Sequence, residues 1–162
     1  MTEAAQRYLD DFRVGERFDA PPITLGAEHF RMFADMTGDD HPIHYDAEYA
    51  CGLGLEAPIV HGLLLVATTA FGAAPAAHSV HEAMIAMLGT EARFSKPVFA
   101  GDTLRRSFEV AGVEPKDESR GILRLALSLH NQREELVLEG EHVIMLRRRR
   151  DGRPDRNRRS PP

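Results

Sequence analysis

The spacing of apolar side chains changes along the chain from a helical period to a strand period. Within residues 26–38, apolar or small side chains recur at i, i+3, i+4 and i+7, which predicts a helix that ends at a left-handed Gly38. Asp46 is placed to cap a second, short helix over residues 47–50. Leucine alternates with mostly polar residues across 122–130, which predicts a strand with one buried face. Weaker patterns predict a strand or hairpin edge over residues 12–18, and strands over residues 84–88, 88–99, 104–110 and 136–146.

One apolar segment, residues 57–77, contains no Asp, Glu, Lys or Arg and is long enough to span a bilayer. It also contains His61, two threonines and two prolines, and no Lys/Arg cluster flanks it. We therefore predict a helix buried inside a folded domain, because a helix that is apolar on all sides belongs either in a core or in a membrane. Helices followed by an antiparallel sheet of three or four strands wrapped around this helix make an α+β fold.

Composition divides the chain into one domain and a tail. With 162 residues, 43% of them hydrophobic, the chain can bury a single core, and one cysteine, Cys51, fits a reducing cytoplasm without an internal disulfide. Eight arginines and two aspartates follow Leu146, and no apolar residue does, so we expect a domain over 1–146 and a disordered tail over 147–162. The tail is either solvated or a docking arm for acidic partners. Its lack of aromatic residues argues against nucleic acid.

The sequence TGDDHPIHYD, residues 37–46, concentrates the candidate chemistry. Asp39, His41 and His44 could ligate a metal, but Pro42 prevents the helix that would align two histidines, and no cysteine pair supports such a site. Across a bent loop, Asp39 and His44 could instead converge on one water molecule as an acid–base pair. A capped turn with a hydrogen-bonded, partly buried His44 is the simpler alternative.

A second candidate is His61-Gly62, at the start of the apolar helix. The first N–H groups of a helix have no partner inside it, and they favour developing negative charge. Gly62 lacks a side chain, so that a substrate carbonyl could approach its N–H closely. A glycine needed only for helix packing would give the same sequence.

Three stretches together resemble a known family: FADMTGDDHPIHYDAEYA, PIVHGLLL and RFSKPVFAGDTL. They are similar to the MaoC-like dehydratases, the (R)-specific enoyl-CoA hydratase group of the hot-dog fold. The family motif runs aromatic, small residue, G-D-x-N-P-hydrophobic-H, and the resemblance covers roughly residues 10 to 146. Where the family has Asn, this chain has His41, which can hydrogen-bond in its place. The matching positions are Phe33, Thr37, Gly38, Asp39, Pro42, Ile43 and His44.

The resemblance implies a single hot-dog domain, an antiparallel sheet around a long central helix, paired into a homodimer. It implies that Asp39 and His44 form a catalytic dyad, that the Gly62 N–H stabilises an oxyanion, and that His41 and His61 lie beside the substrate. The reaction would be hydration of a trans-2-enoyl thioester of CoA or acyl carrier protein to the (3R)-3-hydroxyacyl thioester, or its reverse, without metal or cofactor. An acyl-CoA thioesterase and a non-catalytic acyl-thioester-binding subunit are the alternatives.

Overall fold

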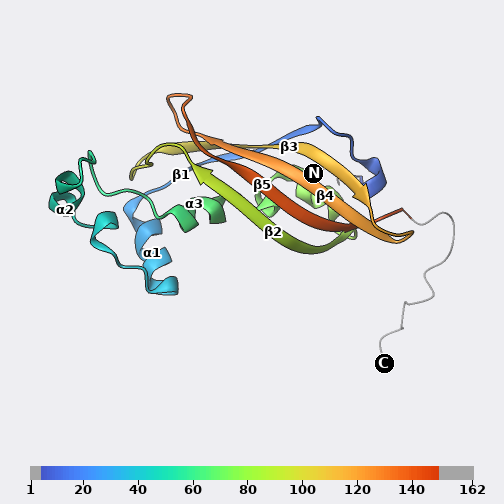
Figure 1. Cartoon of the computed structure of the whole chain (residues 1–162), viewed down its shortest axis with the longest axis horizontal. Helices are drawn as coiled ribbons and strands as arrows, with labels where there is room; N and C mark the ends of the chain where they lie inside the picture. The colour runs from blue at the N-terminus through green and yellow to red at the C-terminus, as the bar shows by residue number, and fades with distance from the viewer. Residues whose placement is uncertain (1–4, 150–162) are drawn as a thin grey trace.

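A five-stranded antiparallel sheet forms the body of the molecule, in the order β1-β3-β4-β5-β2 (Figure 1). The computed structural model describes residues 5–149. Because β1 and β2 lie at the two edges, the last three strands form a meander in the centre, as the sequence predicted, and β2 returns to pair with β5. The strands are β1 (Arg17–Thr24), β2 (Met84–Phe94), β3 (Thr103–Pro115), β4 (Arg120–His130) and β5 (Leu136–Arg147).

Short helices occupy one face and one end of this sheet. Helices α1 and α2 lie together at the end where β2 finishes, and α3 lies behind the sheet in the view of Figure 1. The α-helices are α1 (Ala27–Thr37), α2 (Ala47–Gly52) and α3 (Gly62–Thr68). The described residues also form four 3-10 helices: η1 (Leu9–Asp11) before β1, η2 (Pro42–His44) between α1 and α2, and η3 (Phe71–Ala73) and η4 (Pro75–Val80) between α3 and β2.

The core lies between the inner face of the sheet and α3. Along β4 the predicted period of two is confirmed, since the leucines that face inward are at most 5% exposed: Leu123, Leu125, Leu127 and Leu129. They share one apolar cluster with Leu65 of α3 and Phe108 of β3. Full burial of one such side chain contributes roughly 1.5–3 kcal/mol. The α+β class predicted from the sequence is therefore confirmed.

The predicted continuous helix over residues 57–77 is wrong in its length. Helix α3 has seven residues, and the 3-10 helices η3 and η4 follow it, the latter with proline at its first position. The hydroxyls of Thr68 and Thr69 donate hydrogen bonds to the carbonyls of Leu65 and Val66, a local pattern that competes with helix continuation. Within residues 5–149, no helix is both long and apolar enough to cross a membrane.

Strand boundaries also differ from the predicted ones. The strands predicted over 84–88 and 88–99 form one strand, β2, which already ends at Phe94, and β3 continues past its predicted end at residue 110 to Pro115. There the Asp117 carboxylate accepts hydrogen bonds from the Ser119 and Arg120 amides and closes the β3–β4 turn. The strand predicted over 12–18 begins only at Arg17, after a turn at Gly15 (φ 87°).

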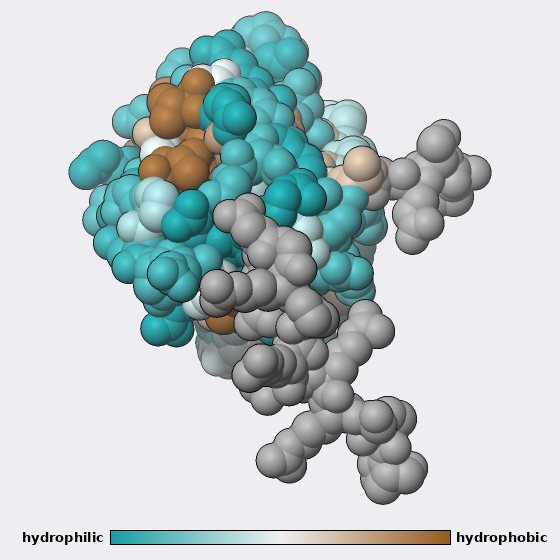
Figure 2. All heavy atoms as spheres, turned by 90° about the vertical axis from the view of Figure 1, so that its right-hand side faces the viewer, coloured by the Kyte–Doolittle hydropathy of each residue, from teal (hydrophilic) through white to brown (hydrophobic). Residues whose placement is uncertain are grey.

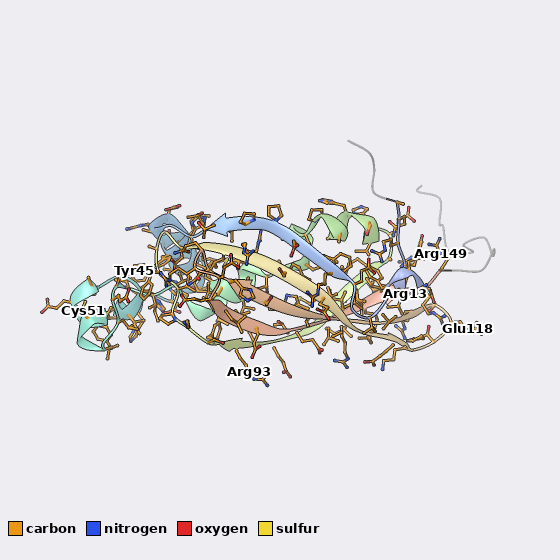
Figure 3. All side chains as sticks on the ribbon, turned by 90° about the horizontal axis from the view of Figure 1, so that it is seen from above. Arg13, Tyr45, Cys51, Arg93, Glu118 and Arg149 are labelled. Atoms are coloured by element: carbon orange, nitrogen blue, oxygen red, sulfur yellow. The ribbon has the colours of Figure 1, made fainter. Side chains whose placement is uncertain are left out.

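The first residues of the predicted tail contact the start of the chain. Strand β5 runs one residue past Leu146, and Arg148 and Arg149 then form ion pairs with Asp10 and Asp11 of η1. Arg149 lies at the opposite end of the molecule from Tyr45 (Figure 3). The face at this end is mostly hydrophilic, with a hydrophobic cluster toward its upper left (Figure 2). The disorder predicted for the rest of the tail concerns residues 150–162, which lie outside the described residues.

Candidate active site

A tightly turned loop connects α1 to α2 and carries the candidate acid–base residues. Helix α1 ends at Gly38 with φ 79°, and the Asp39 amide then donates to the Thr37 hydroxyl at 3.3 Å. Proline begins η2, and the Asp46 carboxylate caps α2 through the Tyr49 amide at 3.0 Å. The predictions of a left-handed Gly38 and of an Asp46 cap are both confirmed.

Three side chains from this loop and from the start of α3 converge. One carboxylate oxygen of Asp39 and one ring nitrogen each of His44 and His61 lie within 4.8 Å of one another. Asp39 is exposed, His44 is half-buried and His61 is buried. The loop thus brings Asp39 and His44 together, as the acid–base hypothesis requires. Their roles remain predictions.

His44 has its tautomer set by a main-chain carbonyl. Its Nδ1 lies 2.7 Å from the Ile59 oxygen, which can only accept, so Nδ1 carries the hydrogen. In the neutral ring, Nε2 then holds a lone pair. The Ile59 amide in turn donates to the Ile43 carbonyl at 3.1 Å, which fixes the loop against the segment that leads into α3.

His61 lies against the ring of His44, and the two ring centroids are 3.8 Å apart. Its Nε2 lies 3.1 Å from the main-chain oxygen of Asp39 and 3.2 Å from the hydroxyl of Tyr45. Burial lowers the pKa of His61, which favours the neutral ring. The side chain is 1% exposed and is therefore enclosed by protein.

His41 stands apart from this group. It is exposed, its Nδ1 accepts a hydrogen bond from the Ile43 amide at 3.3 Å, and its ring meets Tyr49 edge to face at 5.5 Å. His41 thereby caps η2 from within the loop, a bond that the family's asparagine could also supply. The predicted contact of His41 with substrate remains a prediction.

Gly62 is the first residue of α3 and directly follows His61. As a first helical residue, it has an N–H without a partner inside the helix. A Cβ added at this position would lie 3.0 Å from the Phe94 ring, at the end of β2. Phe94 is 52% exposed, so its ring forms an apolar wall beside the Gly62 backbone.

The three converging groups also resemble a metal-binding set, and their hydrogen bonds argue against it. His61 Nε2 carries the hydrogen that it donates to the Asp39 carbonyl, so this nitrogen has no free lone pair to bind a metal. His44 Nε2 and the Asp39 carboxylate remain as possible metal ligands. Two ligands are one fewer than the three that the protein supplies in catalytic zinc sites. The set differs from the one considered from the sequence, because His61 takes the place of His41.

Sequence reasoning missed Tyr45, which lies at the same end of the molecule as Cys51 (Figure 3). Its hydroxyl donates to the Phe30 carbonyl at 2.8 Å and contacts His61. The only available signal was its position directly after His44. Phe94 was read as a strand residue, and its contact with Gly62 depends on tertiary structure alone.

Comparison with known proteins places the chain in a family. Residues 11–128 match the MaoC like domain, so the chain belongs to the MaoC-like domain family. The fold is the α+β hot-dog fold predicted from the resemblance. Relatives in this family are named as hydratases and dehydratases, so the chain belongs to a family of hydro-lyases.

Three similar proteins illustrate the relationship. An (R)-specific enoyl-CoA hydratase from Aeromonas caviae is 32% identical over 125 residues, 75% of this chain and 87% of the relative. A mesaconyl-CoA hydratase from Cereibacter sphaeroides is 31% identical over 157 residues, 95% of this chain but only 45% of the relative. A solved structure from Archaeoglobus fulgidus, described as a monoamine oxidase regulatory protein, has a TM-score of 0.86 at 30% identity and covers 93% of this chain and 100% of that one.

Proposed function

We propose that this chain hydrates trans-2-enoyl thioesters to (3R)-3-hydroxyacyl thioesters, or catalyses the reverse dehydration. The observation that carries the proposal is that one ring nitrogen of His44 and one carboxylate oxygen of Asp39 lie within 4.8 Å of each other, while the bond from Nδ1 to Ile59 leaves a lone pair on Nε2 of the neutral His44 ring. The name of the Aeromonas caviae relative supports this reaction and its stereochemistry.

In this proposal a water molecule lies between the Asp39 carboxylate and Nε2 of His44. One of these groups takes a proton from the water as the oxygen adds to C3 of the conjugated thioester. A proton is delivered to C2, so that the elements of water are added across the double bond. Positioned acid–base groups contribute roughly 10²–10⁴ in rate.

The thioester oxygen gains negative charge when water adds to C3, and we assign its stabilisation to the Gly62 N–H. The missing side chain at this position lets a carbonyl approach the amide, beside the ring of Phe94. Removing one such donor typically costs about 2.7–4 kcal/mol of transition-state stabilisation. The carrier is CoA or acyl carrier protein, since relatives named for each are similar to this chain.

We further propose that two copies of the chain pair through β2. This strand lies at the edge of the sheet, where unpaired backbone groups are open to another strand. Its large apolar side chains are between 38% and 53% exposed: Met84, Ile85, Met87, Leu88 and Phe94. Sedimentation of the purified chain is expected to give a dimer, and a monomer at micromolar concentration would contradict the pairing.

Crotonyl-CoA separates the proposed reaction from the alternatives. Loss of the enoyl absorbance without release of free thiol is the expected result for a hydratase. Release of free thiol would indicate a thioesterase, in which water attacks the carbonyl itself. Binding without turnover would indicate a non-catalytic subunit. The similar Archaeoglobus fulgidus protein is described as a regulatory protein, which makes this alternative worth testing. A series of enoyl-CoAs of increasing length then defines the acyl preference.

A further inference from the structure

One hydrogen atom on His61 joins three parts of the site. The Asp39 main-chain oxygen, 3.1 Å from Nε2, can only accept, so Nε2 must carry the hydrogen. The Tyr45 hydroxyl uses its own hydrogen on the Phe30 carbonyl of α1 and therefore accepts from the same Nε2, at 3.2 Å. The imidazole at the start of α3 thus connects the Asp39 loop with Tyr45 and, through it, with α1.

The surroundings of His61 favour a neutral ring with a bare Nδ1. The rings of Phe30 and Phe33 lie 5.8 Å and 4.8 Å away, and the titratable groups in contact with it are Asp39, His44 and Tyr45. Among the residues that the structure describes, Nδ1 is buried and has no hydrogen-bond partner. A protonated ring would place a second N–H donor at this position, where burial without a partner is costly.

The main chain at Asp39 has few other constraints. Its amide donates a long hydrogen bond, 3.3 Å, to the Thr37 hydroxyl, and its side chain is exposed. The bond from His61 therefore fixes the carbonyl side of Asp39, while the face of the same ring supports the ring of His44 at 3.8 Å. Both members of the proposed dyad are therefore in contact with one buried side chain, that of His61.

We propose that His61 is a positioning residue, which holds the Asp39 backbone through Nε2–H and supports His44 with its ring face, so that the two side chains share one water molecule. This inference rests on the proposed function. It assigns His61 the role of positioning Asp39 and His44 in place of direct contact with substrate. A misplacement of catalytic groups by about 1 Å can lower the rate by about 10²-fold.

Two substitutions separate the hydrogen bond from the bulk of the ring. His61→Phe keeps a planar ring and removes the donor, whereas His61→Gln offers an amide N–H near the position of Nε2. We expect His61→Phe to lower kcat on crotonyl-CoA by about 10²-fold with KM nearly unchanged, and His61→Gln to recover most of the loss. A kcat for His61→Phe within about twofold of the wild type, or a His61→Gln variant no better than His61→Phe at equal thermal midpoint, would overturn the proposal.

Two readouts do not depend on turnover and so keep this inference distinct from the proposed function. Nitrogen NMR of the wild-type imidazoles is expected to show His61 as the neutral Nε2–H tautomer at pH 6.5, the pKa of an unperturbed histidine. A crystal structure of His61→Phe is expected to show the Asp39 carbonyl displaced, and one of His61→Gln to show it in place. An Nδ1–H tautomer, or an Asp39 unmoved in His61→Phe, would overturn the positioning role. Absence of hydratase activity in the wild type would instead refute the proposed function.

Discussion

Replacing Asp39 with asparagine removes a charge from the proposed dyad and leaves the surrounding hydrogen bonds intact. The contacts that place this residue use its main chain: the amide donates to Thr37, and the carbonyl accepts from His61. Asn is nearly isosteric, and the side chain is exposed, so the free energy of unfolding should change by at most about 0.5 kcal/mol. Loss of a positioned acid–base group should lower kcat by roughly 10²–10⁴-fold.

The assay follows the enoyl absorbance of crotonyl-CoA and the thermal midpoint of the same preparation. Asp40→Asn is the matched control, since it makes the same chemical change at the next residue, which is also exposed and lies outside the converging group. We expect the control to keep wild-type turnover. If Asp39→Asn retained more than about a tenth of the wild-type kcat, the carboxylate would not do the acid–base work assigned to it.

Four further results are expected. Burial lowers the pKa values of His61 and His142, so the unfolded chain binds protons more readily, and urea midpoints should fall as pH drops below about 6.5; a constant midpoint down to pH 5.5 would contradict this. Gly62→Ala should lower kcat/KM by about 10²-fold with little loss of stability, because its methyl meets only a half-exposed ring; unchanged kcat/KM would remove the oxyanion role. Truncation after Arg149 should preserve stability, whereas truncation after Leu146 should lower the thermal midpoint, since it removes the ion pairs with η1; equal midpoints would show that these pairs contribute nothing. Dialysis against a chelator should leave turnover unchanged, and a clear loss would indicate a metal at the converging groups.

Local periodicity and turn chemistry were sufficient to predict much of the fold. The alternating leucines of β4 and the end of α1 at Gly38 depend on neighbouring residues alone, so the sequence displays them directly. The convergence of Asp39 with His44 could be predicted as one of two alternatives for the same reason, because Gly38 directly precedes the short segment that joins them and Pro42 bends it.

Features set by distant residues could not be predicted. One such feature is the contact between the end of α3 and Arg106 of β3, whose buried guanidinium donates to the Thr68 carbonyl at 2.9 Å. The same side chain donates to the carbonyl of Pro21 in the edge strand β1. Most of this strand was not predicted, because it contains two consecutive prolines, which argue against a strand. The bond between His61 and the Asp39 carbonyl likewise spans 22 positions of the sequence, and no local pattern reports it.

The most direct measurement is the fate of isotopically labelled water. Wild-type protein is incubated with crotonyl-CoA in H₂¹⁸O, and the products are identified by mass spectrometry with chiral separation. We expect an intact thioester that carries one heavy oxygen on C3, in the (3R) configuration. Heavy oxygen in a free carboxylate, or recovery of unlabelled crotonyl-CoA alone, would contradict it.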